Sequence, residues 1–73
     1  MEIKLSNWEA LVLEDVLAKL EQTSGFQEID MAGRMVLYKI HALLEQGMEE
    51  LFDPNYQNIL HQAREEVMKS LGA

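Results

Sequence analysis

Residues 30–51 read DMAGRMVLYKIHALLEQGMEEL. Apolar side chains recur in this segment at helical spacing, without loss of phase, at Val36, Leu37, Ile40, Leu43, Leu44, Met48 and Leu51. Asp30 stands just before the pattern, where a carboxylate caps the free backbone amides of a first helical turn. Gly47 would end the helix as a C-cap, but it falls on the apolar face, where a missing side chain lets another helix approach. We therefore predict one helix over residues 31–51.

The chain before this segment predicts a first helix. Ser6 and Glu9 have the Ser-x-x-Glu spacing of a capping box, in which each side chain accepts a hydrogen bond from a free backbone amide at a helix start. The apolar residues that follow share one helical face, and they are Ala10, Val12, Leu13, Val16, Leu17 and Leu20. A helix is expected over residues 6–22, because Thr23-Ser24-Gly25 is a turn-forming cluster.

The chain after this segment predicts a third helix over residues 54–71. Asp53 is a capping residue and Pro54 follows it, and proline suits the first helical position because its missing N–H has no partner there. The apolar stripe of this helix consists of Tyr56, Ile59, Leu60, Ala63, Val67 and Leu71.

The three predicted helices define the expected fold class. Each has one apolar face and the connections are short, which favours an all-α protein with a small bundle of three helices. Met1, Ile3 and Leu5 alternate with charged residues, which is typical of a short extended N-terminal arm. A chain of 73 residues has room for one core, so residues 1–73 are expected to form a single domain.

Composition limits the classes of partner. Thirteen acidic and six basic residues give a formal net charge of −7, which repels phosphate backbones and anionic lipid headgroups. Direct binding to nucleic acid or to a membrane is therefore not expected, whereas a basic protein partner is favoured. The chain has no cysteine, and its first residues lack the basic start and apolar run of a signal peptide. We expect a cytoplasmic protein.

A second apolar stripe on the predicted middle helix is the main candidate for a partner-binding surface. Met31, Met35, Tyr38 and Ala42 recur at positions i, i+4, i+7 and i+11, away from the face assigned to the core. Methionine and tyrosine are favoured at protein interfaces. An exposed stripe of this kind needs a cover, which is either a partner or the chain's own Phe26 and Ile29 or N-terminal arm.

Two further groups of residues are assigned to partner binding. Trp8 and Leu11 lie on the flank of the first helix, where a large aromatic side chain can anchor a partner. The alternative for Trp8 is packing against Ile3 and Leu5. Negative charge crowds the end of the middle helix, against the helix dipole, at Glu45, Glu49 and Glu50. These carboxylates either face a basic partner or form a solvated surface.

Metal binding and catalysis are not expected. His41 with Glu45, and His61 with Glu65, have the spacing of neighbours on one helical face, but both pairs fall on predicted polar faces. The serines lie at a cap, a turn and the tail, without a nucleophile elbow or a phosphate-binding loop. The predicted protein is not an enzyme and has no metal ligands and no cofactor.

Several short motifs occur together in this chain: EALVL at residues 9–13, Val36-Leu37 with Leu43-Leu44-Glu45, and LFDPNY at residues 51–56 with ILHQAR at residues 59–64. As a set they resemble small, acidic, uncharacterised bacterial and phage proteins of similar length. The resemblance implies a bacterial or phage origin and no activity. Pro54-Asn55-Tyr56-Gln57 is also similar to a segment of the helical-hairpin co-chaperones of type III secretion needle subunits, although proline and tyrosine are one residue closer here.

The function predicted from the sequence is a non-enzymatic protein-binding module. Inhibitors, antitoxin-like or immunity-like factors and small subunits of bacterial or phage assemblies belong to this class. The alternatives are a self-assembling helical protein, in which the second stripe meets its own copy in a homodimer, and a secretion co-chaperone.

Overall fold

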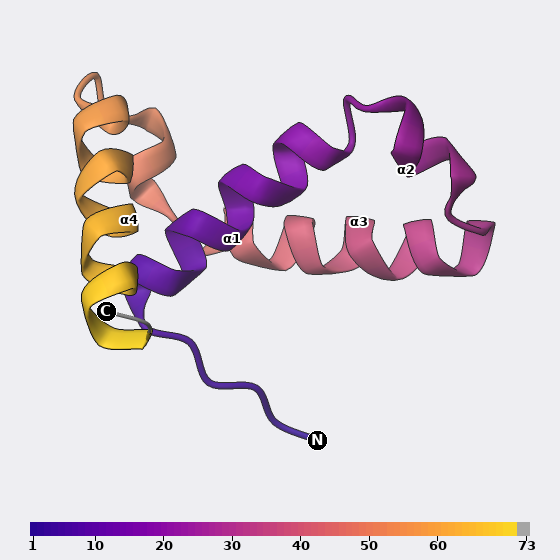
Figure 1. Ribbon diagram of the computed structural model, residues 1–73, viewed down its shortest axis with the longest axis horizontal. Coiled ribbons are helices and arrows are strands. Elements are labelled where there is room, and N and C mark those ends of the chain that lie inside the picture. Colours follow the sequence, from indigo (N-terminus) through magenta and orange to yellow (C-terminus); the bar gives the residue numbers. More distant parts are fainter. Residues whose placement is uncertain (72–73) are drawn as a thin grey trace.

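The computed structural model describes residues 1–71, and these contain helices and no strand (Figure 1). The elements in chain order are α1 (Asn7–Leu20), α2 (Ser24–Glu28), α3 (Met31–Gln46), the 3-10 helix η1 (Glu49–Phe52) and α4 (Tyr56–Leu71). The predicted all-α class is confirmed. Gly72 and Ala73, the end of the predicted domain, lie outside the described residues.

Two helix starts follow the predicted capping chemistry. The backbone N–H of Glu9 donates to the Ser6 hydroxyl oxygen at 3.1 Å, and the backbone N–H of Ser6 donates to the Glu9 carboxylate at 2.8 Å. The backbone N–H of Gly33 donates to the Asp30 carboxylate at 2.8 Å. Because each contact spans only three residues, local sequence is enough to place both starts.

The predicted continuation of the middle helix through Gly47 is wrong. α3 ends at Gln46, and Gly47 is its C-cap, with its N–H directed to the carbonyl oxygens of the preceding turn. Met48 then turns inward until only 4% of its surface is exposed, and η1 begins at Glu49. The chain leaves the α3 axis at this point, and Met48 packs with Leu11 of α1 and Ala63 of α4 in the core.

The start of the last helix is also later than predicted. Pro54 and Asn55 form a turn, in which the Asn55 N–H donates to the Asp53 carboxylate at 2.7 Å, and α4 begins at Tyr56. Asp53 therefore stabilises the turn before the helix rather than its first turn. The segment Thr23-Ser24-Gly25, which was predicted to be a turn, contains the start of α2. This five-residue helix buries Phe26 completely.

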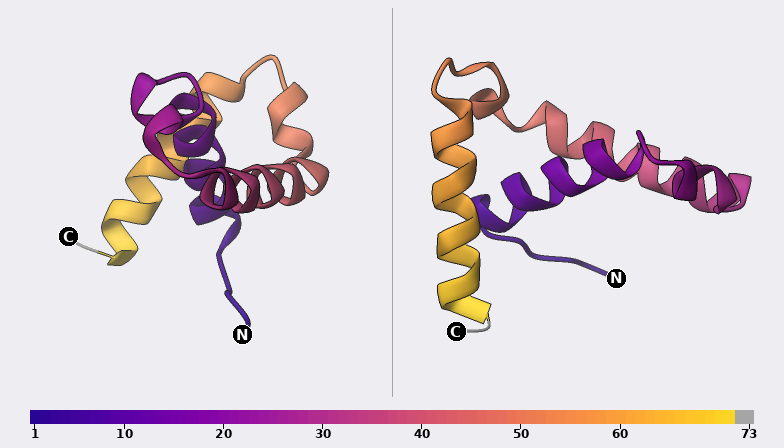
Figure 2. Two further views of the ribbon diagram at one scale, coloured as in Figure 1. Left: turned by 90° about the vertical axis from the view of Figure 1, so that its right-hand side faces the viewer. Right: turned by 45° about the horizontal axis from the view of Figure 1, so that its top comes forward.

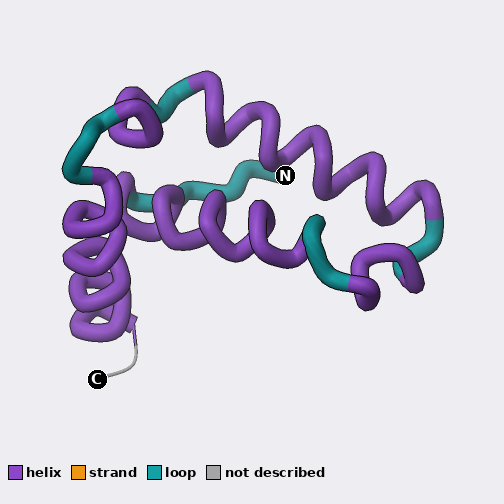
Figure 3. Tube along the Cα trace, turned by 90° about the horizontal axis from the view of Figure 1, so that it is seen from above, coloured by secondary structure: helices purple, strands orange, loops and turns teal. Residues whose placement is uncertain are grey.

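The helices do not form an aligned bundle. In Figure 1, α1 and α3 run in opposite directions and are joined at their far end by α2, while α4 crosses near the other end of α1. The turned views in Figure 2 and the view from above in Figure 3 show the same arrangement. The main core lies at this crossing, where Leu11, Met48 and Ala63 pack together with partly buried neighbours that include Trp8 and Leu44.

α3 is attached along one side only. None of its residues, all of which are described, is buried. The radius of gyration of 13.2 Å exceeds the value of about 11 Å expected for a compact chain of this length. Val36 and Leu43, which the periodicity assigns to the core, are each 57% exposed, and Val16 on α1 is 51% exposed. The assignments of these three residues to the core are wrong. α3 packs mainly against α1, and a helix that packs mainly against one other helix buries a narrower face than a helix inside a bundle.

Substitution of one core residue and one α3 residue tests this arrangement. Leu11→Ala is expected to lower the free energy of unfolding by about 2 kcal/mol or more, because Leu11 is 0% exposed and its removal leaves a cavity. Val36→Ala is expected to change it by about 0.5 kcal/mol or less. Urea unfolding followed by circular dichroism measures both values. Equal losses for the two variants would contradict the open placement of α3.

Candidate functional site

The Met–Tyr stripe, defined as Met31, Met35, Tyr38 and Ala42, lies on the outer side of α3. Met31 is 67% exposed, Met35 is 64% exposed and Tyr38 is 49% exposed, and Ala42 is also exposed. The Phe26 ring meets the Tyr38 ring edge to face, with centroids 5.4 Å apart. α2 therefore covers part of Tyr38 and leaves both methionines open.

The chain's other proposed covers lie elsewhere. Ile29 lies close against Gly33. A side chain at position 33 would not fit beside it, since its Cβ atom would lie 2.7 Å from Ile29 Cγ2. The N-terminal residues Ile3 and Leu5 line an apolar hollow of about 320 Å³. Its remaining lining comes from α1 and α3 and consists of Leu13, Ile40, Leu43 and Leu44. No residue of the Met–Tyr stripe lines this hollow, so the arm does not act as the cover of the stripe.

The remaining residues assigned to partner binding are in different environments. Leu11 is completely buried, so its assignment to a partner surface is wrong. Trp8 is partly buried against the same core. Glu50 accepts a hydrogen bond from the Asn7 amide at 2.9 Å, and this bond lowers the pKa of the Glu50 carboxyl group. Glu49 is exposed.

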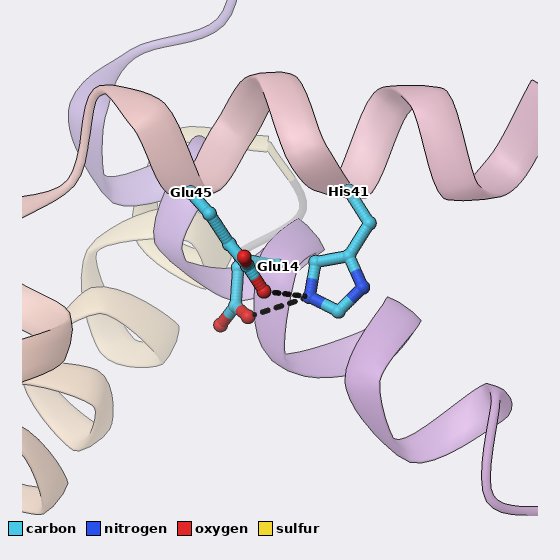
Figure 4. Close-up of side chains that lie close together, drawn as sticks. All are labelled: Glu14, His41 and Glu45. Atoms are coloured by element: carbon cyan, nitrogen blue, oxygen red, sulfur yellow. Dashed lines mark hydrogen bonds and ion pairs between the residues drawn. The ribbon is translucent and has the colours of Figure 1, made fainter.

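A cluster of charged side chains between α1 and α3 was not predicted. The His41 side chain is 14% exposed, and its Nε2 atom lies 2.9 Å from Glu14 Oε1 on α1 and 2.9 Å from Glu45 Oε1 on α3 (Figure 4). Its Nδ1 atom contacts the Glu21 carboxylate. We call Glu14, Glu21, His41 and Glu45 the carboxylate–histidine cluster. The prediction that His41 lies on a polar, outward face is wrong.

Glu14 links the cluster to α4. It is the buried charged residue of the described chain, with 6% of its surface exposed. The Tyr56 hydroxyl donates to Glu14 Oε2 at 3.3 Å. Burial raises the pKa of the Tyr56 phenol, and the negative charges of Glu14 and Asp15 raise it further. Glu14 thus presents one oxygen to Tyr56 and the other to His41.

Opposing effects act on the pKa of His41. Burial lowers it, because a desolvated imidazolium is unfavourable. The hydrogen bonds with Glu14 and Glu21 and the negative charges of Glu21 and Glu45 raise it, and together they bring it above its ordinary value. In the absence of other ligands, the cluster therefore favours a proton on His41.

The second predicted histidine pair has a different environment. His61 Nε2 lies 3.1 Å from Glu65 Oε1, but the two side chains are 75% and 58% exposed. Its outward orientation agrees with the sequence prediction. Two His-x-x-x-Glu pairs with the same spacing are therefore distinguished by α1, which brings further carboxylates to His41 only.

A sequence signal for the cluster exists in retrospect. Glu14 of α1 and Glu21, its C-cap residue, are seven residues apart and lie on one side of the helix axis, as His41 and Glu45 share a face of α3. The two pairs meet because α1 and α3 are antiparallel neighbours. That arrangement is a tertiary property, so neither pair reveals it alone.

Comparison of the chain with known protein families, with curated proteins and with solved structures finds no significant match. The helices over residues 1–71 also lack the combination of length and apolar character that a bilayer-crossing segment requires.

The raised pKa of His41 predicts a pH-dependent stability of the metal-free protein. A group whose pKa is higher in the folded state stabilises the fold below its unfolded pKa of about 6.5, and the stabilisation is lost as the pH rises through the folded value. The melting temperature in chelator is therefore expected to fall as the pH rises above about 6.5 and passes through the higher pKa that His41 has in the folded protein. The fall should be smaller in His41→Gln and unchanged in His61→Gln. An identical fall in all three proteins would show that His41 does not contribute.

Proposed function

We propose that this chain is a non-enzymatic protein-binding module and that the Met–Tyr stripe of α3 is its contact surface. The supporting observation is the exposure of Met31 and Met35 on a helix whose opposite side already lies against α1. Each large apolar side chain that a partner buries completely contributes about 1.5 to 3 kcal/mol, which makes a covered stripe more favourable than an exposed one.

The local chemistry of the stripe suits recognition of another protein. The flexible methionine side chains adapt to an apolar partner surface. Tyr38 is oriented by the edge-to-face contact with Phe26, so it loses little conformational freedom on binding. Val36 and Leu43 are also exposed on α3 but lie outside the stripe, and Leu43 lines the hollow beside the N-terminal residues.

Charge indicates the chemistry of the partner. The net charge of −7 and the exposed Glu49 near the end of α3 favour a partner with basic residues around its apolar contact. An inhibitor, an antitoxin-like or immunity-like factor, and a small subunit of a bacterial or phage assembly all fit this description. We further propose a cytoplasmic location.

Two alternative functions use either the Met–Tyr stripe or the antiparallel pair of α1 and α3. In a self-assembling protein, the Met–Tyr stripe would meet a second copy across a two-fold axis. In a secretion co-chaperone, the α1–α3 pair would hold an apolar helix of its client. A foreign partner is preferred over a second copy because this acidic chain repels its own copies.

Met35→Glu tests the proposed surface, and Met68→Glu is its matched control. The two methionines are 64% and 68% exposed, so either substitution places a new charge in water and is expected to change the melting temperature little. The partner is first identified by site-specific photo-crosslinking from position 35 in cells of the source organism. Only Met35→Glu is then expected to lose binding to this partner. The dissociation constant of the purified partner is then measured for both variants.

The oligomeric state separates the alternatives. A parent protein that is monomeric by sedimentation across a dilution series, and a purified partner that loses at least about tenfold affinity for Met35→Glu, support the proposal. A parent dimer that Met35→Glu converts to a monomer supports self-assembly instead. Unfolding of Met35→Glu, or equal losses of affinity with Met68→Glu, would contradict a contact surface at the stripe.

Glu49→Gln tests the proposed basic partner. Removing an exposed charge near the contact should slow association at low salt and reduce its salt dependence, because long-range attraction acts mainly on the association rate. Glu65→Gln on α4 removes the same charge from a different helix and is expected to have a smaller effect. Stopped-flow association across a salt series measures both rates, and equal rates for the two variants would argue against a directed contact.

A further inference from the structure

We propose that Glu14, His41 and Glu45 form a binding site for one divalent transition-metal ion, with Zn²⁺ as the best-fitting ion. Their ligand atoms lie within 4.8 Å of one another, and they are the one group of this kind found among residues 1–71. The site lies between α1 and α3, and it is separate from the Met–Tyr stripe.

The distances fit a shared ion. Two ligands of a tetrahedral zinc ion, each about 2.1 Å from the metal, lie about 3.4 Å apart, so the ligand atoms have to separate by about 0.5 Å. His41 Nε2 is 2.9 Å from the Glu14 oxygen and 2.9 Å from the Glu45 oxygen. A metal ion can therefore replace the proton between these atoms with small movements of the side chains (Figure 4).

The donor set selects the class of ion. An imidazole nitrogen favours zinc and other transition metals, whereas all-oxygen sites favour magnesium and calcium. Glu45 is 53% exposed, so solvent reaches one side of the site and water can complete the coordination. Three protein ligands and an open position are compatible with reversible loading.

Glu21 and Tyr56 act as positioning residues. Glu21 accepts from His41 Nδ1–H and so keeps the ring oriented with Nε2 toward Glu14 and Glu45, where Nε2 can bind the ion once its proton is displaced. Tyr56 donates to the second oxygen of Glu14 at 3.3 Å and holds that carboxylate in place. Histidine ligands in metal sites are commonly oriented by a carboxylate in this manner.

The charge balance of the cluster favours an added cation. Glu14, Glu21 and Glu45 surround a single imidazole, and Glu14 is almost completely buried. Even a protonated His41 leaves more negative than positive charge in this partly desolvated space. A divalent ion offsets more of that charge than the single proton it displaces.

Binding should also stabilise the contact between α1 and α3. Glu14 belongs to α1, whereas His41 and Glu45 belong to α3, which has no buried side chain to hold it. An ion that bridges the two helices binds the folded state more tightly than the unfolded chain and therefore raises the melting temperature.

Calorimetric titration of the chelator-treated full chain with Zn²⁺ is the primary test. The expected result is one ion per chain and, at about one hundred times the dissociation constant, a melting temperature raised by on the order of 10 °C. Glu45→Gln should weaken binding by at least about tenfold, and Glu21→Gln by about ten- to a hundredfold through loss of His41 orientation. Glu65→Gln, which alters the exposed pair of α4, is the matched control and should bind like the parent.

A nitrogen-15 spectrum of the imidazoles identifies the ligand atom. On addition of Zn²⁺ the His41 Nε2 resonance should shift while the His61 resonances stay in place, and His41→Gln should lose one-to-one binding. If His41→Gln does not fold, Glu45→Gln and the spectrum decide the result. No binding of Zn²⁺ by the parent, binding that Glu45→Gln leaves unchanged, or a shift confined to His61 would overturn the proposal.

Discussion

The imidazole of His41 is the contact on which the placement of α3 depends. It lies between the Glu45 carboxylate of α3, the Glu14 carboxylate of α1 and the carboxylate of Glu21, the C-cap residue of α1, and its side chain is 14% exposed. The buried centre of the apolar core belongs to α1, α4 and the segment after α3, and α3 itself reaches this core through Leu44, which is only partly buried. A polar contact of this kind adds modest stability and is better suited to selecting one relative orientation of two helices. The protein therefore has an apolar crossing of α1 with α4, whereas the contact of α1 with α3 combines apolar side chains with the charged groups around His41.

The parts of the fold that were predictable are those determined within a few residues. The capping box at Ser6 and the cap at Asp30 place two helix starts, because each side chain satisfies backbone amides three residues away. The end of α3 also had a local signal, because Gly47 is its C-cap, but the apolar phase favoured the wrong alternative of continuation. Helical phase continues through Gly47 to Leu51, and what ends the helix is the burial of Met48 against Leu11 and Ala63, which are distant in sequence. Periodicity assigned a broad core face to α3 on the assumption of a bundle, whereas the crossing of α4 leaves Val36 and Leu43 exposed.

The two candidate sites also differ in whether local sequence or tertiary contacts determine them. The Met–Tyr stripe follows from helical spacing alone, and its exposure is consistent with the prediction of an outward face. The carboxylate–histidine cluster depends on the packing of α1 against α3. The amphipathic pattern of one helix does not reveal which other helix packs against it. Helical spacing places Glu14 opposite the apolar face of its helix, yet Glu14 is buried with its two oxygens directed to His41 and Tyr56. Burial of a charged side chain requires hydrogen-bond partners, and those of Glu14 come from α3 and α4.

The cluster and the stripe are coupled through the rotation of α3 about its own axis. Residues 38 and 41 are less than one turn apart, so the direction in which His41 points determines where Tyr38 and the methionines lie. With His41 held against Glu14 and Glu21, the Met–Tyr stripe is turned away from α1, and Phe26 of α2 can reach only its Tyr38 edge. A helix held by apolar packing alone could lower its energy by rolling the methionines inward. Rolling α3 in this structure would break the contacts of His41 and leave Glu14 buried without its histidine partner, and it would also remove Leu44 from the apolar core. The His41 contacts and the apolar side of α3 therefore both oppose a rotation that would bury the methionines of the stripe.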